Sequence, residues 1–339
     1  MDTFSFSIIV PCHNEAGVIG RKLDNCLALS AQCPVDVLVV DDHSTDDTAA
    51  IAAERLRSSL SLPPGWTIRF LTNRHMPGKN GALRTAFEAA KGSLYLITDA
   101  DVMLGADTLE RVRACFEADP TLGALCLSPR IASANRLTEA HYASGYEAFN
   151  RRLKMLQSRL DSVPILHGQA MFIRASLKIV PHENLPGDDV DFSFQVRLQG
   201  SRVRYAPDLP FYEEISPDSA RVFEQKIRRA KAVMLSLWHY KRVLFNPRYG
   251  FFGLLCVPLD FLFYFLLPPL VLAGIVAWAL WVFRQYGAAG FVAIVGLGLC
   301  LSLVRPVRRI GLYLRILLIS QWRLLLEQRP HIRWQPHRQ

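Results

Sequence analysis

The first hundred residues alternate short apolar runs with stretches of helical spacing, and this alternation limits the folds open to the chain. Each apolar run is too short for a helix and reads as a buried strand. The runs cover residues 6–10, 35–40, 68–71 and 94–97, and the helical stretches between them cover residues 18–29, 48–60 and 82–91. Strand–helix alternation at this spacing predicts an α/β fold with a doubly wound parallel sheet.

Acidic side chains follow these predicted strands where each one ends. Asp99 and Asp101 come directly after the fourth strand, and Asp41 and Asp42 after the second. Ligands of open α/β sheets bind beyond the carboxyl ends of the strands. An Asp-x-Asp pair there offers two hard oxygen donors for a divalent cation held against substrate phosphates. Alone, the pair also fits an ordinary polar loop, so the prediction depends on the neighbouring loops.

Two common nucleotide-binding patterns are missing from the sequence. No G-x-G-x-x-G follows the first strand, which argues against a dinucleotide-binding fold. Gly78-Lys79 is followed by Asn80 rather than Ser or Thr, so the segment is not a Walker loop. Without a glycine-rich cradle, the diphosphate of a nucleotide would need a metal ion and a lysine. Asp101 and Lys79 can supply these.

Four segments, taken in chain order, resemble the motifs of the inverting family 2 glycosyltransferases, whose fold is called GT-A. They are residues 11–15, 39–44, 78–83 and 99–101. The resemblance implies a nucleotide-diphosphate sugar as donor, UDP-linked, and Mn²⁺ or Mg²⁺ as cofactor. It also implies the following roles: Pro11, Glu15 and Asp41 or Asp42 at the base and ribose, Lys79 at the diphosphate, Asp99 at the nucleoside and Asp101 at the metal.

An acidic segment further along the chain matches the part of the family pattern that carries the catalytic base. Asp188 and Asp189 stand at the start of a predicted helix, where acids also complement the helix dipole. Inverting transfer needs one general base, and burial raises the pKa of a carboxylate towards neutrality. By position in the motif, Asp189 is the base, and Asp188 stands where the family usually has Glu. Residues 165–174 are strand-like and resemble the family's acceptor-side segment.

The segment 225–229 resembles the Gln-x-x-Arg-Trp motif of membrane-embedded polysaccharide synthases. The resemblance places Gln225 and Arg228 near the acceptor and the diphosphate, and Arg229 stands where the motif has Trp. That Trp is a stacking platform for a sugar, so its replacement favours transfer of one sugar per acceptor over processive polymerisation. Arg228 and Arg229 also fit a basic helix face near a membrane, and this interpretation is compatible with a role in catalysis. Residues 137–159 are expected to form a helix whose basic side chains, Arg151, Arg152, Lys154 and Arg159, face solvent.

A long apolar stretch follows, and Asp260 is its only acidic or basic side chain between residues 251 and 283. The stretch is too long for one straight crossing of a bilayer, and Pro268-Pro269 is expected to break it. We expect an interfacial helix over 245–262, a first span over 266–283, a tight turn at 284–287 and a second span over 288–304. Arginines flank both spans, which places the catalytic domain and both termini in the cytoplasm. Residues 310–326 read as an amphipathic surface helix.

Net charge and cysteine content limit the kinds of ligand and the cell compartment that suit this chain. The chain has 39 Lys and Arg against 30 Asp and Glu, a formal net charge of +9. Anionic lipid and phosphorylated ligands explain this excess, and no basic–aromatic interleaving indicates nucleic acid. The seven cysteines form no CxxC pair, which argues for a reducing compartment and against a zinc site.

The sequence thus predicts a GT-A domain over residues 1–232, interfacial helices over 233–265, a transmembrane helical hairpin over 266–304 and a basic amphipathic tail over 305–339. The expected protein is an inverting glycosyltransferase of the bacterial inner membrane. It would transfer sugar to a lipid-linked or saccharide acceptor, beside membrane lipids, and oligomers are left open. Two alternatives remain: a processive polysaccharide synthase, and a non-catalytic membrane scaffold that keeps the fold.

Overall fold

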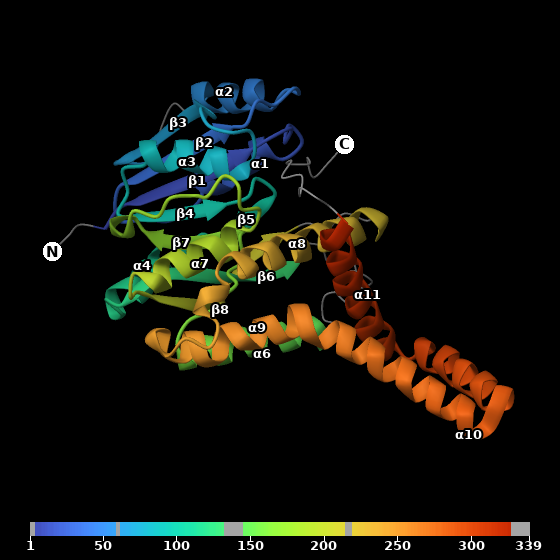
Figure 1. The fold of residues 1–339 in the computed structure, drawn as a ribbon. Coiled ribbons are helices and arrows are strands. Elements are labelled where there is room, and N and C mark those ends of the chain that lie inside the picture. The colour runs from blue at the N-terminus through green and yellow to red at the C-terminus, as the bar shows by residue number, and fades with distance from the viewer. Residues whose placement is uncertain (1–3, 59–61, 132–144, 214–218, 327–339) are drawn as a thin grey trace. The chain divides into compact units, whose positions relative to one another are not determined.

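The computed structural model describes residues 4–58, 62–131, 145–213 and 219–326 (Figure 1). The chain divides into two compact units. The first contains Met1–Ala134, Lys154–Ile215 and His331–Gln339, and the second contains Asn135–Leu153 and Ser216–Pro330. The first unit is an α/β domain and the second is helical. The domain boundaries given in the sequence analysis stay predictions.

The first unit is built on one eight-stranded sheet with the order β3-β2-β1-β4-β7-β6-β8-β5. The strands are β1 (Phe6–Cys12), β2 (Val35–Asp41), β3 (Trp66–Thr72), β4 (Leu94–Thr98), β5 (Val102–Leu104), β6 (Leu122–Ile131), β7 (Ala170–Arg174) and β8 (Arg202–Glu213). Strands β1, β2, β3 and β4 pair in parallel with one another. This confirms the predicted parallel arrangement for that half of the sheet.

The prediction of a wholly parallel sheet is wrong for the other half. Strand β7 runs antiparallel to both β4 and β6, and β5 runs antiparallel to β8, while β6 and β8 are parallel. The sheet is therefore mixed. The strand-like segment 165–174 contributes only its last five residues as β7, and β5, β8 and the helix α4 (Thr108–Ala118) were not predicted.

Helices cover both faces of this sheet. Side chains of successive strand residues point to opposite faces, so neighbouring residues of one strand pack against different helices. Ile8 belongs to a core cluster with residues of α1 (Ile19–Leu27), α2 (Thr48–Ser58) and α4. Ile9, the next residue of β1, belongs to a separate cluster with α3 (Lys79–Ala89) and α7 (Asp188–Leu198). All residues of β1 and β2 are buried, as expected for central strands with helices on both sides.

The second unit contains α8 (Ser219–His239), α9 (Val257–Phe261), α10 (Leu267–Leu303) and α11 (Arg305–Leu326), and α6 (Gly145–Leu160) begins in it. Ile227 and Ala230 of α8 pack against Ile316 of α11. Arg323 of α11 donates to both carboxylate oxygens of Glu224 on α8, at 2.6 and 3.0 Å. Residues 310–326 are thus helical, as predicted, and one face of α11 is used for packing against α8.

The predicted break at Pro268-Pro269 is wrong, because the helix continues through both prolines into α10. A π-helical turn, Leu262–Leu266, ends two residues before the first of these prolines. Such wider turns loosen the helix register where a hydrogen bond is missing. Within α10 the backbone leaves the helical conformation at Gly287, with φ 62° and ψ −153°. Gly287 lies in the predicted turn 284–287, and its positive φ suits glycine.

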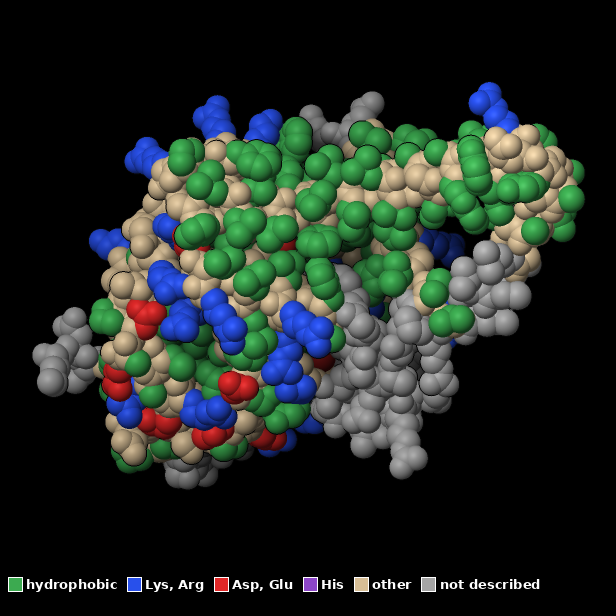
Figure 2. All heavy atoms as spheres, turned by 90° about the horizontal axis from the view of Figure 1, so that it is seen from below, with side chains coloured by type: hydrophobic (Ala, Val, Ile, Leu, Met, Phe, Trp, Pro, Cys, Tyr) green, Lys and Arg blue, Asp and Glu red, His purple; other side chains and the backbone are tan. Residues whose placement is uncertain are grey.

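One helical segment of the described residues, Phe252–Gly290, is long and apolar enough to cross a membrane. Most of its most apolar window is exposed rather than packed in a core. Figure 2 shows hydrophobic side chains gathered along the helices of this unit. Exposed large apolar side chains on α10 include Leu270, Ile275, Trp278, Leu280, Trp281 and Phe283.

Candidate active site

The candidate site centres on the ammonium group of Lys79, the first residue of α3. Its Nζ atom lies 2.8 Å from Oδ1 of Asp99 and 3.1 Å from Oδ2 of Asp188. It also donates a hydrogen bond of 2.9 Å to the carbonyl oxygen of Gly168. Three segments that the sequence analysis singled out therefore meet at one atom: the lysine loop, the Asp-x-Asp segment and the acidic start of α7.

The charged state of Lys79 is strongly favoured. Burial alone would lower the pKa of Lys79, but the carboxylates of Asp188 and Asp99 outweigh burial and raise that pKa above its ordinary value. The side chain of Lys79 is a fixed cation at the carboxyl ends of the strands, in a place where a diphosphate can be neutralised.

Asp42 holds the loop that leads to Lys79. Its Oδ1 accepts a hydrogen bond of 2.6 Å from Asn73 Nδ2, and its Oδ2 accepts one of 2.7 Å from the backbone N–H of Gly78. Gly78 has a φ of 128°, which an L side chain rarely adopts. The buried carboxylate of Asp42 thus fixes the turn before α3, while any contact of Asp42 with the nucleoside stays a prediction.

The loops after β1 and β2 are tied to one another. Asp41 Oδ1 accepts from the Ser44 hydroxyl at 2.5 Å, and the Ser44 hydroxyl oxygen in turn accepts from the Asn14 N–H at 2.9 Å. The N–H of Glu15 donates to the Thr48 hydroxyl at 2.8 Å, and the side chain of Glu15 is buried. Glu15 and Asp41 therefore lie in linked loops at neighbouring strand ends, with Pro11 in the buried part of β1.

The Asp-x-Asp segment forms a tight turn between β4 and β5. The N–H of Asp99 donates to the carbonyl oxygen of Gln169 at 3.1 Å, and the N–H of Val102 donates back to the carbonyl of Asp99 at 3.3 Å. Both Asp99 and Asp101 are partly exposed. The turn thus presents two carboxylates to the outside, with Asp99 engaged by Lys79 and Asp101 beside it.

Asp188 and Asp189 begin α7 and have different surroundings. Burial raises the pKa of Asp188, with the Lys79 ammonium opposing the shift. Burial likewise raises the pKa of Asp189, to about 6, and repulsion from Asp188 adds to the rise. Oδ1 of Asp189 accepts a hydrogen bond of 2.9 Å from the N–H of Val190. A carboxylate with such a pKa can accept a proton near neutral pH.

Gly168 lets the backbone approach this acidic pair closely. A Cβ atom at residue 168 would lie 3.4 Å from both Asp188 Oδ1 and Asp189 Cβ. Oδ2 of Asp188 is buried and, within the described residues, has no hydrogen bond in addition to its ionic contact with Lys79. That oxygen can still accept a hydrogen bond, for example from a substrate hydroxyl.

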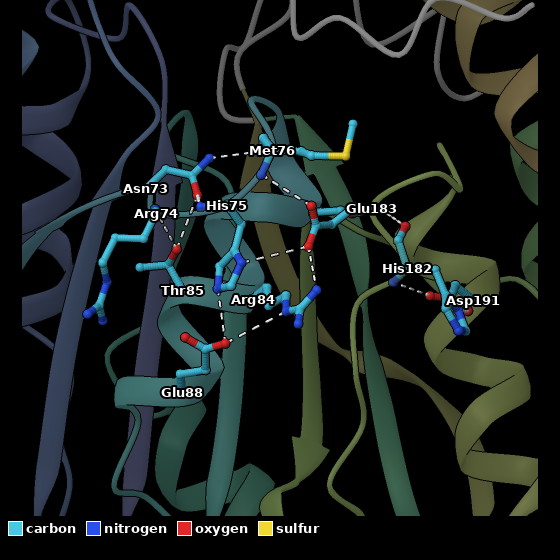
Figure 3. A network of polar contacts seen from close by, with 11 residues as sticks. Asn73, Arg74, His75, Met76, Arg84, Thr85, Glu88, His182, Glu183 and Asp191 are labelled. Atoms are coloured by element: carbon cyan, nitrogen blue, oxygen red, sulfur yellow. Dashed lines mark hydrogen bonds and ion pairs between the residues drawn. The ribbon is translucent and has the colours of Figure 1, made fainter.

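A polar network ties the loop before α7 to α3 (Figure 3). Asn80 Nδ2 donates to the carbonyl oxygens of His182 and Leu185, at 2.9 and 2.6 Å. Glu183 accepts from Arg84 at 2.6 Å and from the N–H of Met76 at 3.2 Å. The helix that begins with Lys79 and the helix that begins with Asp188 are therefore held together through residues 182–185.

This network continues into α7 itself. His182 binds Asp191 twice, through its backbone N–H at 3.2 Å and its ring Nδ1 at 2.8 Å (Figure 3). Asp191 is completely buried, two residues beyond Asp189. The sequence analysis gave no role to Asn80, His182 or Glu183, because each of them contacts groups that other parts of the fold supply, and such contacts leave no pattern in the sequence.

Lys154 departs from the prediction that the basic residues of 137–159 face solvent. The side chain is only 4% exposed, its ammonium donates to the carbonyl of Ile165, and its charge acts against the rise of the Asp189 pKa. Arg152 and Arg159 are exposed as expected. Residues 137–144 of the predicted helix lie outside the described residues.

Gln225, Arg228 and Arg229 lie on α8 of the second unit. Arg228 and Arg229 are exposed and Gln225 is partly exposed. Their predicted role beside the acceptor and the diphosphate stays a prediction, whereas the other predicted site residues all belong to the first unit.

The residues present suit a metal ion only if a substrate completes its coordination. Among the described residues, no group of three or more His, Cys, Asp and Glu side chains could hold a metal ion. Asp101 is a partly exposed carboxylate beside a second one, Asp99. Divalent ions that bind nucleotides are commonly held by one or two carboxylates plus substrate phosphates, and the turn fits this arrangement.

Comparisons with known proteins show the family of this chain. A model described as "Glycosyl transferase family 2" matches residues 7–179, and one described as "Glycosyl transferase family group 2" matches residues 95–294. Poly-beta-1,6-N-acetyl-D-glucosamine synthases from Staphylococcus aureus and Staphylococcus epidermidis are 22% identical over 228 residues, which is 66% of this chain. The chain covers 53% of the length of these relatives, about half.

A solved structure is similar over almost the whole chain. The mannosyltransferase from Pyrobaculum calidifontis, in complex with GDP-Man and Mn²⁺, has a TM-score of 0.78 and 24% sequence identity. The match covers 95% of this chain and 87% of the mannosyltransferase. The likeness shows the GT-A fold.

Proposed function

This chain belongs to glycosyl transferase family 2, and we propose that it moves a sugar, with inversion, from a nucleotide-diphosphate sugar to a hydroxyl group of a lipid-linked or saccharide acceptor. The observation that carries the proposal is the position of the Lys79 ammonium between Asp99 and Asp188. Next to it stands Asp189, whose pKa burial raises to about 6. These positions support a role for Lys79 as the cation that neutralises the leaving diphosphate and for Asp189 as the base that acts on the acceptor.

The proposed reaction is a single displacement at the anomeric carbon. The acceptor hydroxyl oxygen forms the new bond to that carbon, the bond to the diphosphate oxygen breaks, and the hydroxyl proton passes to Asp189. The nucleoside diphosphate leaves with the bonding electrons, and Lys79 stabilises its negative charge. Apart from its ionic contact with Lys79, Asp188 Oδ2 accepts no hydrogen bond within the described residues, and it is proposed to accept one from a sugar hydroxyl.

Asp101 is proposed to hold Mn²⁺ or Mg²⁺ together with the diphosphate. When bound, the ion neutralises charge on the departing nucleoside diphosphate. The support comes from the turn itself, which offers two neighbouring carboxylates and needs substrate oxygens to complete a coordination shell. The similar mannosyltransferase was solved with Mn²⁺.

We propose a UDP-linked donor, which is what the resemblance of the sequence motifs to the family 2 pattern implies. A GDP-linked donor is the second candidate, because the mannosyltransferase that is similar over 95% of the chain was solved with GDP-Man. Glu15, Asp41, Asp42 and Asp99 are the proposed contacts of the nucleoside, and Pro11, near the end of β1, precedes the loop that carries Glu15.

The second unit is proposed to anchor the enzyme in the membrane. The exposed apolar surface of Phe252–Gly290 supports at least one span, and the interruption of α10 at Gly287 fits a hairpin of two spans with its turn there. With both ends of the hairpin in the cytoplasm, the site would meet lipid-linked acceptors at the inner membrane. Arg229 in place of Trp favours one sugar per acceptor over a processive synthase.

The test is nucleotide release by the purified full-length protein in detergent with Mn²⁺, over a panel of UDP- and GDP-sugars. We expect release from one donor, dependent on an acceptor from lipid extract, and its loss in Asp189→Asn. Release that persists unchanged in the variant would show that Asp189 is not the base. If no donor gives nucleotide release, the non-catalytic scaffold alternative would be favoured.

A further inference from the structure

Lys22 of α1 has a completely buried side chain, with 0% of its surface exposed. Its Nζ donates to the Thr98 hydroxyl at 2.8 Å and to the carbonyl oxygen of Val102 at 2.5 Å. Lysine is almost never fully buried unless it is paired. Such a position needs an explanation, and the two acceptors suggest one.

The two acceptors of Lys22 lie on either side of the Asp-x-Asp turn. Thr98 is the last residue of β4 and Val102 is the first residue of β5. The turn between them is residues 99–101, so one ammonium group binds the chain where it enters the turn and where it leaves it.

The charges around Lys22 agree with this geometry. Burial lowers the pKa of Lys22, and the groups that act against the lowering are Cys26, Asp99 and Asp101. The two carboxylates of the turn thus provide the negative charge that offsets the buried ammonium. Lys22 lies behind the turn, on α1, whereas Lys79 contacts Asp99 from α3.

We propose that Lys22 is a positioning residue that fixes the Asp99–Asp101 turn in the conformation that binds the metal–nucleotide complex. The proposal rests on the proposed function. Lys22 does not touch the metal or the substrate; it acts through the backbone and the hydroxyl group that hold the two carboxylates. Groups that orient metal ligands in this way typically change metal affinity by about 10- to 100-fold when they are removed.

The sign of the effect separates positioning from simple charge repulsion. A buried cation close to a metal site repels the metal ion. If Lys22 acted only through its charge, Lys22→Met would therefore strengthen Mn²⁺ binding. If Lys22 positions the turn, Lys22→Met weakens Mn²⁺ binding although a positive charge has been removed.

Asn25 supplies a matched control on the same helix. Its Nδ2 donates to the carbonyl of Leu104 at 2.9 Å, and its Oδ1 accepts from the N–H of Leu104 at 2.9 Å. Asn25→Ala therefore also removes two hydrogen bonds between α1 and β5, but at the end of β5 away from the turn. It reproduces the loss of stability without loosening residues 99–101.

The experiment compares wild type, Lys22→Met and Asn25→Ala as full-length proteins in detergent. Amide hydrogen exchange is measured over residues 98–102 without metal or nucleotide, and Mn²⁺ affinity is measured by electron paramagnetic resonance with UDP and with GDP. We expect faster exchange of the Val102 amide and about tenfold weaker Mn²⁺ binding in Lys22→Met alone.

The proposal is overturned if Lys22→Met binds Mn²⁺ as tightly as wild type or more tightly, or if its turn amides exchange as in wild type. If Lys22→Met does not fold, Lys22→Gln, which keeps a side-chain donor, is expected to bind Mn²⁺ with intermediate affinity. The exchange measurement needs neither donor sugar nor turnover, so it judges the role of Lys22 separately from the proposed reaction.

Discussion

The Nζ atom of Lys79 lies 3.1 Å from Oδ2 of Asp188, and these two residues begin different helices, α3 and α7. The same ammonium lies 2.8 Å from Asp99. The residue proposed to neutralise the diphosphate is thus in contact with the helix that carries the proposed base. Binding of the donor and placement of the base are linked through one cation.

We expect Lys79→Met to lower kcat by about 10²- to 10³-fold, the usual effect of removing one preorganised electrostatic contact to a developing charge. UDP or GDP affinity is expected to fall as well. Nucleotide release and isothermal titration measure the two effects. Lys91→Met, an exposed lysine just beyond the same helix, is the control and is expected to behave as wild type.

The rate of transfer is expected to depend on the ionisation of Asp189. Its pKa is raised to about 6, so the base is protonated below this pH and ionised above it. We expect kcat/KM, at saturating Mn²⁺, to rise about tenfold per pH unit below pH 6 and to level off above it. A profile that is flat between pH 5 and pH 7 would contradict the assignment.

Asp189→Asn is expected to stabilise the fold while it abolishes transfer. The folded-state pKa of Asp189 lies above its ordinary value, so the folded protein binds more protons than the unfolded chain between about pH 4 and pH 6. Stability from this group is therefore lost as pH rises through that window. The Tm difference between Asp189→Asn and wild type should grow from pH 4 to pH 6 and then stay constant. Equal differences at pH 4 and pH 7 would refute it.

Asn80→Ala is expected to destabilise the protein by about 1–3 kcal/mol per carbonyl left without a donor. The variant removes the hydrogen bonds to His182 and Leu185. It should also lower kcat, because α7 is then held to α3 less firmly, with the contact between Arg84 and Glu183 remaining. Urea denaturation and nucleotide release measure these effects. Glu88 lies on the same helix as Asn80 and has an exposed contact with His75. As the control, Glu88→Gln is expected to lower the free energy of unfolding by less than about 1 kcal/mol and to leave kcat unchanged.

Removal of the metal is expected to stop transfer without unfolding the protein. The described residues contain no three-ligand cluster, so a metal ion held partly by substrate contributes little to the stability of the free enzyme. EDTA should abolish nucleotide release, Mn²⁺ should restore it, and Tm without nucleotide should not change. Asp101→Asn should require more Mn²⁺ for the same rate, and an unchanged requirement would remove Asp101 from the metal site.

The sequence predicted the parallel half of the fold well because each strand there is an uninterrupted apolar run that ends at a polar loop. Val35–Asp41 is buried over its whole length and reads as a strand from composition alone. Strand β5 has three residues, too few for any periodicity, and β8 is only partly buried. Their antiparallel pairing is set by partners far away in the sequence.

In the candidate site too, residues marked by short motifs were predicted and residues defined by distant partners were not. Lys79, Asp99 and Asp188 were predicted because short motifs mark them, and the structure brings them into contact. Lys22 and Asn80 were not predicted, because their partners are backbone carbonyls and a hydroxyl supplied by other elements. A lysine in a helix of mixed polarity is most often on the surface, so only the fold shows that Lys22 is buried.

The place of β8 in the sheet has a consequence for biosynthesis. β8 lies between β6 and β5, both of which leave the ribosome earlier, so the sheet cannot close until Glu213 has emerged. Long-range pairing of this kind is slow compared with local helix formation. The apolar helical segment that begins at Phe252 follows soon afterwards. If the second unit is the membrane anchor that we propose, completion of the sheet and delivery of the nascent chain to the membrane would fall in the same short period of translation.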